Sequence, residues 1–257
     1  GHKSVYDHMF MDGLEDAYTG RPMGSFDQET ENERGITREQ MDAIAIESLT
    51  RAKKAIDNGS LQAEIAPGTV TTRKGAVVVA DDEQQHKAAI EKIPNLRPAF
   101  AKDGSITAAN SSSISDGASA LVLTGEAHAE ARGLKPMARI VAHARHSQEP
   151  NEFTIAPIGA IRKLFEKTGW SVDDVDLFEI NEAFAMVTML AIQDLGLDHS
   201  KVNVHGGACA QGHPIGSTGS RIIVTLMYAL RQLGKQRGVA ALCIGGGEAT
   251  AVGIELI

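Results

Sequence analysis

The sequence has few cysteines, few aromatic residues and no long apolar run. Two cysteines in 257 residues exclude a disulfide framework and favour a reducing compartment, with the cytoplasm as the expected location. No stretch approaches 18 consecutive apolar residues, and residues 1–4 lead into mixed polar sequence. We therefore expect neither a membrane span nor a signal sequence.

Basic charge is also scarce, and the common catalytic signatures are missing. There are 25 Lys and Arg against 33 Asp and Glu, a formal net charge of −8, which argues against nucleic-acid binding through phosphates. The sequence lacks G-x-S-x-G, the phosphate loop G-x-x-x-x-G-K-[ST], H-E-x-x-H, C-x-x-C and G-x-G-x-x-G. The absence of these motifs argues against a serine esterase, a P-loop enzyme, a zincin and a dinucleotide dehydrogenase. No metal site is expected.

What is present is an ordinary soluble composition with one unusual feature. Apolar residues make up 42% and charged residues 23%, and the length suits one large domain or two small ones. Many of the 26 glycines gather near the C-terminal end, at Gly206, Gly207, Gly212, Gly216, Gly219 and residues 245–247. Glycine suits positive φ and close backbone approach, so these two clusters are candidate sites.

The first 110 residues predict a mainly helical region with a small strand or two. Thr37 and Gln40 form a capping box before an apolar periodicity that ends at Asn58-Gly59. An earlier helix is expected over residues 4–18. Over residues 74–92, short apolar segments alternate with charged residues.

After Gly117 the pattern predicts alternating strands and helices. Strands are expected over residues 118–123, 137–144, 175–180, 202–204, 239–244 and 249–256, and helices over residues 125–132, 157–167, 182–195 and 217–233. From residue 137 on this is an α/β order, βαβαβαββ, which predicts a mostly parallel sheet covered by helices. Ligands of such sheets bind beyond the carboxyl ends of the strands, where Asn181 and both glycine clusters lie.

Three motifs at these strand ends carry candidate chemistry. In G-H-P-I-G, His213 lies on a rigid turn before a long helix and could act as a base or simply cap the helix. Cys243, followed by three glycines, could be a reactive thiol beside amides that hold an oxyanion, or an inert buried residue. Asn181 could donate a hydrogen bond to a water or carbonyl oxygen, or be an N-cap with Glu182 complementing the helix dipole. Cys209 is interpreted as structural.

The three motifs N-E-A-F at 181–184, G-H-P-I-G at 212–216 and C-I-G-G-G at 243–247, in this order and spacing, resemble the C-terminal half of thiolases. The resemblance continues through Met23-Gly24, the helix after Thr37, L-R-P-A-F at 96–100 and A-N-S-S at 109–112 with Asp116-Gly117. Asp12-Gly13-Leu14 is more similar to the acetoacetyl-CoA branch, acetyl-CoA C-acetyltransferase, than to the long-chain branch. The resemblance implies a coenzyme A-binding loop domain over residues 1–116, a strand and helix that complete the N-terminal half over 117–135, and a C-terminal thiolase domain over 136–257.

The resemblance also implies residue roles and a reaction, the condensation of two acetyl-CoA to acetoacetyl-CoA and coenzyme A, or its reverse. His213 would activate the nucleophilic cysteine, Cys243 would move the α-proton of acetyl-CoA, Asn181 would hold the water of one oxyanion site and the Gly245 amide would serve the other. Substrate contacts would come from Ser112, Ala108, Met23, Phe100 and Phe184. No cofactor beyond the coenzyme A thioesters is implied.

The sequence departs from the family in three respects. Neither Cys209 nor Cys243 occupies the motif of the family's nucleophile, so we expect that cysteine in an N-terminal half that the chain lacks, supplied by a further segment or chain. Gln85-His86 stand where the family often has an Arg near the coenzyme A phosphates, and Cys209 replaces an aliphatic residue. The family suggests a homo-dimer or homo-tetramer. The alternatives are a 3-ketoacyl-CoA thiolase of fatty-acid oxidation and a non-catalytic coenzyme A-binding module.

Overall fold

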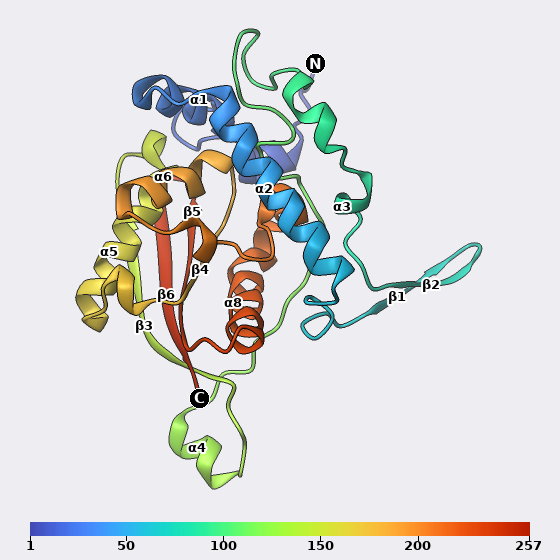
Figure 1. Ribbon diagram of the computed structural model, residues 1–257. Coiled ribbons are helices and arrows are strands. Elements are labelled where there is room, and N and C mark those ends of the chain that lie inside the picture. Colours follow the sequence, from blue (N-terminus) through green and yellow to red (C-terminus); the bar gives the residue numbers. More distant parts are fainter.

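A four-stranded sheet in the order β3-β6-β5-β4 forms the centre of the computed structural model, which describes residues 1–257 (Figure 1). The strands are β3 (Ala138–Ser147), β4 (Leu177–Ile180), β5 (Arg237–Ile244) and β6 (Glu248–Leu256). Only β4 and β5 are parallel, and the other two pairs are antiparallel. The α/β class is confirmed, but the expected mostly parallel sheet is wrong, because a three-residue turn joins β5 to β6 and a turn this short can only reverse the chain.

Helices cover both faces of this sheet. Alternate residues of β5 point to opposite faces: Val239, Ala241 and Cys243 join one core cluster, and Ala240 joins the other. The helix α5 (Ala156–Thr168) packs on the first face, and α8 (Ile215–Gln232) packs on the second (Figure 1). The helix α6 (Ala185–Leu195) lies between α5 and α2 and is buried on most sides.

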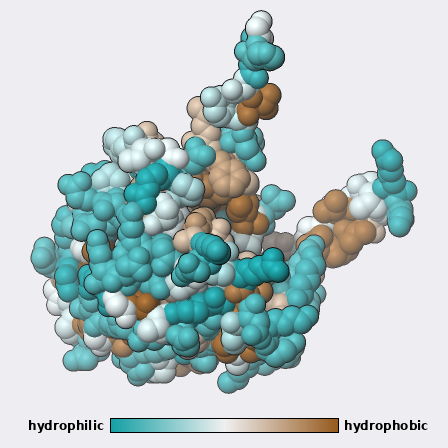
Figure 2. Space-filling model, turned by 90° about the horizontal axis from the view of Figure 1, so that it is seen from above, coloured by the Kyte–Doolittle hydropathy of each residue, from teal (hydrophilic) through white to brown (hydrophobic).

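The first 110 residues combine helices with one small β-hairpin. They contain α1 (Met23–Arg34), α2 (Arg38–Asp57), α3 (Gln84–Lys87) and a hairpin of β1 (Gly68–Thr72) and β2 (Gly75–Val79). The capping box of Thr37 and Gln40 is confirmed, whereas residues 4–18 hold only the five-residue π-helix η1 (Phe10–Leu14). The hairpin projects from the body with an apolar patch of exposed valines (Figure 2), which are Val70, Val77, Val78 and Val79.

Two expected strands do not form. Residues 118–123 have no strand partner and are mostly exposed, and residues 202–204 make only an isolated bridge from Val202 to Phe178. An apolar run becomes a strand only when a neighbour satisfies its backbone hydrogen bonds. The expected helix near 125–132 is confirmed as α4 (Glu126–Ala131).

The remaining elements are short, with three to six residues each. They are α7 (Ala208–Gln211) and the 3-10 helices η2 (Ile90–Asn95), η3 (Pro150–Glu152), η4 (Val172–Asp174) and η5 (His199–Lys201). None of the helices combines the length and the apolar character that a membrane span requires.

Candidate functional site

Asn181 lies where β4 ends, beside the end of β5. Its backbone N–H donates to the Ala241 carbonyl at 3.0 Å, which continues the parallel pairing of β4 and β5 by one residue. The side chain is 1% exposed, yet its Oδ1 and Nδ2 have no hydrogen-bond partner. The interpretation of Asn181 as an N-cap is wrong, because α6 begins at Ala185 with Phe184 as its N-cap. An unpartnered buried amide is what a site for a bound water or carbonyl oxygen requires.

Glu182 is a buried carboxyl with hydrogen-bond partners on several elements. Its carboxylate accepts hydrogen bonds from the Ser48 hydroxyl at 2.7 Å, the Cys209 amide at 3.0 Å and the Asn203 side chain at 3.1 Å. Burial raises the pKa of Glu182 and these hydrogen bonds oppose the rise. Glu182 therefore joins α2, α7 and the loop after β4, and its expected role of complementing a helix dipole is wrong.

His213 lies between α7 and α8, in a frame that fixes its ring. Its backbone N–H donates to the Ser113 carbonyl at 3.0 Å, and its Nδ1 lies 2.7 Å from the Thr218 hydroxyl. Thr218 donates its own hydroxyl proton to the Pro214 carbonyl at 3.0 Å, so Nδ1–H is the donor to Thr218 and Nε2 is left unprotonated. Burial, helped by Arg221, lowers the His213 pKa to about 4, which keeps the ring neutral at pH 7 and Nε2 free to accept a proton.

Both cysteines are buried free thiols. Cys243 is 8% exposed near the end of β5, and burial raises its pKa to about 12. Cys209 lies in α7, where burial and Glu182 raise its pKa. Neither sulfur is a thiolate at neutral pH in the unliganded protein, so a thiolate there must be stabilised during a reaction.

The turn after Cys243 is built from glycines. Gly246 and Gly247 have φ of 87° and 80°, and a Cβ on Gly247 would lie 2.4 Å from the Gln148 carbonyl oxygen. Gly245 is exposed, and a Cβ there would meet nothing within 4 Å. The second glycine cluster also contains a position with positive φ and no room for a side chain. Gly212 has φ of 86°, and a Cβ there would lie 2.1 Å from the Ser115 hydroxyl.

A segment around Ser112 connects the strand-end loops. The Ser112 amide and hydroxyl donate to the Ala183 carbonyl at 3.0 and 2.9 Å, and the next residue, Ser113, accepts from the His213 amide. Residues far apart in sequence, including those that follow Asn181 and the His213 turn, are thereby held together.

Three of the expected substrate contacts form an apolar wall. The Phe184 ring lies 6.3 Å from the Phe100 ring and 6.2 Å from the Phe153 ring, and Met23 packs against the core cluster that contains Phe184. Gly24 lies so close to Phe100 that a Cβ would be 2.3 Å from the ring. Ala108, by contrast, is exposed, and no described contact joins it to this wall.

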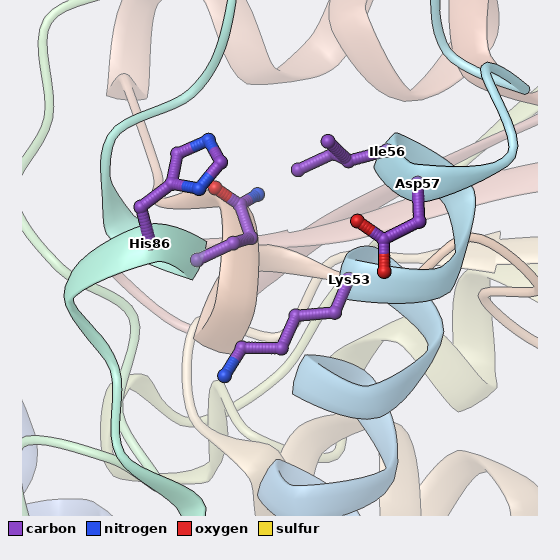
Figure 3. A pocket seen from close by; sticks show the side chains of 5 residues that line it. Lys53, Ile56, Asp57 and His86 are labelled. Carbon is purple, nitrogen blue, oxygen red and sulfur yellow. The ribbon is translucent and has the colours of Figure 1, made fainter.

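A separate cavity of about 240 Å³ lies between α2 and α3. It is lined by Lys53, Ile56 and Asp57 of α2 and by Gln85 and His86 of α3 (Figure 3). The Gln85 side chain is 1% exposed and belongs to the protein interior. Gln85 and His86 stand where the resemblance leads us to expect an Arg, and of these two residues only His86 is exposed. Lys53 supplies a cation in the lining of the same cavity.

The chain matches two family models. The model described as "Thiolase, N-terminal domain" matches residues 1–127, and the one described as "Thiolase, C-terminal domain" matches residues 134–256. Because the first match covers residues 1–127, the expectation that the N-terminal domain is absent is not supported.

Curated relatives and solved structures are similar along the whole chain. The chain is 46% identical to a probable acetyl-CoA acetyltransferase of Dictyostelium discoideum over 99% of its length, and 46% identical to an acetyl-CoA acetyltransferase of Yarrowia lipolytica over 100%. It spans 62% and 64% of the lengths of these relatives. An acetyl-CoA acetyltransferase of Bacillus anthracis superposes with a TM-score of 0.96 at 42% identity, covering 100% of this chain and 65% of that one. Acat5 thiolase from Ascaris suum in complex with coenzyme A superposes at 0.90 with 40% identity, covering 100% and 66%.

Proposed function

Because this chain belongs to the thiolase family, we propose that it carries part of the active site of an acetyl-CoA C-acetyltransferase, which condenses two acetyl-CoA to acetoacetyl-CoA and coenzyme A and also runs the reverse thiolysis. The names of its relatives support this substrate class. The observation that carries the proposal is the buried, unpartnered side chain of Asn181 beside the end of β5. A buried amide without a partner costs about 1–3 kcal/mol, and an oxyanion site that fills when substrate binds explains why it is kept.

We assign the steps to the strand-end residues. The Cys243 thiol first gives its own proton to the coenzyme A thiolate that departs when the acyl group is loaded, or to solvent. The resulting Cys243 thiolate takes a proton from the methyl group of acetyl-CoA, and the enolate oxygen that forms is stabilised by a water held by Asn181. The enolate carbon attacks the acyl carbonyl of an acyl-enzyme thioester, and the amide of Gly245 stabilises the tetrahedral oxyanion until the enzyme thiolate leaves. His213 accepts the proton of that thiol at Nε2 when the next acyl group is loaded.

Binding residues and the wider assembly follow the family resemblance. Ser112 and Ala108 are assigned to the coenzyme A portion, and Met23, Phe100 and Phe184 to the apolar wall beside it. The reaction as written moves protons and an acyl group only, so it needs no metal or redox cofactor. We propose a homo-dimer or homo-tetramer, active in the cytoplasm within fatty acid metabolism.

The acyl-accepting thiol is proposed to lie outside these 257 residues. Cys209 is buried in α7 beside a carboxylate, which opposes its thiolate, and Cys243 is needed for the proton. The relatives are longer than the stretch that this chain matches, which leaves room for such a residue.

Exchange of the acetyl-CoA methyl protons with deuterium tests the proposal, because it needs Cys243 and the Asn181 site but no acyl-enzyme. In heavy water the protein is expected to label acetyl-CoA, as read by mass spectrometry. Cys243→Ala should abolish labelling while coenzyme A binding, measured by calorimetry, persists. Cys209→Ala is the matched control and should label as the wild type does.

The alternatives give different results in the same assays. Coenzyme A binding without any exchange in a folded protein, followed by no cleavage of acetoacetyl-CoA when the nucleophile-bearing segment is added, would leave only a non-catalytic coenzyme A-binding module. A 3-ketoacyl-CoA thiolase of fatty-acid oxidation would cleave long-chain 3-ketoacyl-CoA faster than acetoacetyl-CoA.

A further inference from the structure

The side chain of Asn203 is a buried amide whose hydrogen bonds all go to the segment at the end of β4. Its Oδ1 accepts from the Ile180 N–H at 2.8 Å, and its Nδ2 donates to the Ile180 carbonyl at 2.8 Å and to Glu182 Oε1 at 3.1 Å. Asn203 is 3% exposed. These partners fix which end of the amide is which, because the flipped group would turn an N–H toward the Ile180 N–H and an oxygen toward the Ile180 carbonyl.

The edge of the sheet explains why an amide is needed at this place. β4 is an edge strand, so only one side of its backbone pairs with a neighbour, which is β5. The N–H and carbonyl of Ile180 point to the free side, and the residue is 1% exposed. Buried backbone groups require partners, and the Asn203 side chain supplies them as the backbone of a further strand would.

The backbone of Asn203 adopts an unusual conformation in this position. Val202 pairs with Phe178 in an isolated parallel bridge, and the Asn203 N–H donates to the Phe178 carbonyl at 2.9 Å. Asn203 then has φ of 49° and is the only non-glycine residue of the chain with positive φ. A glycine would adopt this conformation more readily, so what Asn203 provides here is the amide.

Asn203 thereby holds both neighbours of Asn181 in the chain. The Asn181 side chain has no hydrogen-bond partner, so the direction of its amide depends on its backbone and on packing. That backbone is tied to β5 on one side, through the Asn181 N–H and the Ala241 carbonyl. On the other side, Asn203 fixes the residues before and after it, Ile180 and Glu182. Donors of an oxyanion site are effective when they are oriented before the reaction.

We propose that Asn203 is a positioning residue for Asn181: its amide holds residues 180–182 at the free edge of β4 and so directs the Asn181 side chain toward the enolate oxygen. The functional part of this inference rests on the oxyanion role proposed for Asn181. The holding of residues 180–182 can be measured by itself.

Hydrogen exchange of backbone amides, followed by NMR, tests the holding. Asn203→Gly suits the positive φ but lacks the amide, and the N–H groups of Ile180 and Asn181 are expected to lose about tenfold in protection, as the loss of a hydrogen bond predicts. Thr188→Val is the matched control. It removes the other side-chain hydrogen bond to the Ile180 carbonyl, at 3.0 Å, and should leave the protection of both amides unchanged.

A double-mutant cycle on the exchange of acetyl-CoA methyl protons tests whether Asn203 acts through Asn181. Asn203→Gly should lower kcat for this reaction about tenfold at unchanged KM, with kcat expressed per coenzyme A site counted by calorimetry. In the Asn181→Ala background the same change should have no further effect, because the side chain that it directs is gone. A residue that only stabilised the fold would lower both backgrounds equally.

A second variant keeps the test decisive if Asn203→Gly does not fold. Asn203→Ser retains one polar atom at the edge of β4, but it has no second polar atom with which to pair both backbone groups of Ile180, so the same losses are expected. Unchanged amide protection in the folded variants, or equal losses of kcat in both backgrounds, would overturn the inference. Absence of methyl-proton exchange in folded wild type would instead contradict the proposed function, and amide protection would still decide whether Asn203 holds the segment.

Discussion

At the scale of single residues, the polar side chains near the ends of β4 and β5 divide into two kinds. Glu182 is buried with three hydrogen-bond donors and acts as a structural joint. Asn181, its direct neighbour, is equally buried and has none. Glu182 is hydrogen-bonded to residues distant in sequence, such as Ser48, 134 positions away. The polar atoms of Asn181 remain available to bind a ligand.

Asn181→Ala should therefore impair catalysis and leave the fold intact. Loss of one oxyanion-site donor is expected to slow methyl-proton exchange about 100-fold or more, while the affinity for coenzyme A changes little. The midpoint of thermal unfolding should stay the same or rise, because an unsatisfied buried amide is removed. Exchange rates and calorimetry check this, with Asn151→Ala, an exposed asparagine in η3, as control. Full exchange activity in Asn181→Ala would contradict the oxyanion role.

The residues that could be found from the sequence are those marked by local backbone signals. Asn181 follows a strand, His213 lies between Gly212 and Pro214, and Gly245 begins a run of three glycines, and each of these signals can be recognised in a few neighbouring residues. Glu182 carries no such signal. Its importance comes from hydrogen bonds with distant elements, so only the folded structure reveals it.

At the scale of elements, the β5–β6 hairpin fixes the position of Cys243 and Gly245. Its two inner glycines differ in surroundings although both have positive φ: Gly246 is open to solvent, whereas Gly247 lies against the backbone of residues 148–149. This contact holds the end of β5 to the segment before α5. The local environment, not the turn conformation alone, makes one glycine harder to replace.

Gly247→Ala and Gly246→Ala form a matched pair. Together they separate the backbone strain of a positive φ from the steric clash of an added Cβ with residues 148–149. Positive φ costs about 1–2 kcal/mol for a non-glycine residue, so both variants should lose this amount in free energy of unfolding. Gly247→Ala should lose about 2 kcal/mol more, because its Cβ would lie 2.4 Å from the Gln148 carbonyl oxygen and 2.5 Å from that of Glu149. Urea unfolding of the two variants measures the difference. Equal losses would show that the contact with residues 148–149 does not stabilise the hairpin.

The elements that the sequence misplaced are those without a neighbour. The amphipathic helices α2 and α5 are predicted close to their observed bounds because each buries a periodic face. The run at 118–123 has the composition of a strand, but no strand lies beside it. The prediction of a mostly parallel sheet is wrong for another reason, since composition does not specify whether neighbouring strands are parallel or antiparallel.

At the scale of the whole molecule, the charge of one half-buried cation, Arg221, acts on titratable groups of the His213 turn and of the sheet. The Arg221 guanidinium lowers the pKa of His213 and opposes the burial that raises those of Glu64 and Glu179, to about 7 and about 8. The two effects on stability have opposite signs. The unfolded chain binds the His213 proton first as pH falls from about 6.5 to about 4, so that region loses stability in acid, while the two glutamates lose stability as pH rises.

Glu179→Gln isolates the second of these effects. Glu179 lies in β4 on the face that α8 covers, and its folded pKa of about 8 is far above the ordinary 4.5. Below pH 4.5 both states hold the proton, and between 4.5 and 8 only the folded state does, so rising pH costs stability that a neutral amide would not lose. The variant should match the wild type near pH 4.5 and be more stable by about 2 kcal/mol or more at pH 8. Chemical unfolding across this pH range measures the difference in stability. The control variant Glu166→Gln, at an exposed position of α5, is expected to follow the wild type. A constant difference in stability between Glu179→Gln and wild type at every pH would mean that Glu179 is ionised in the folded protein throughout this range.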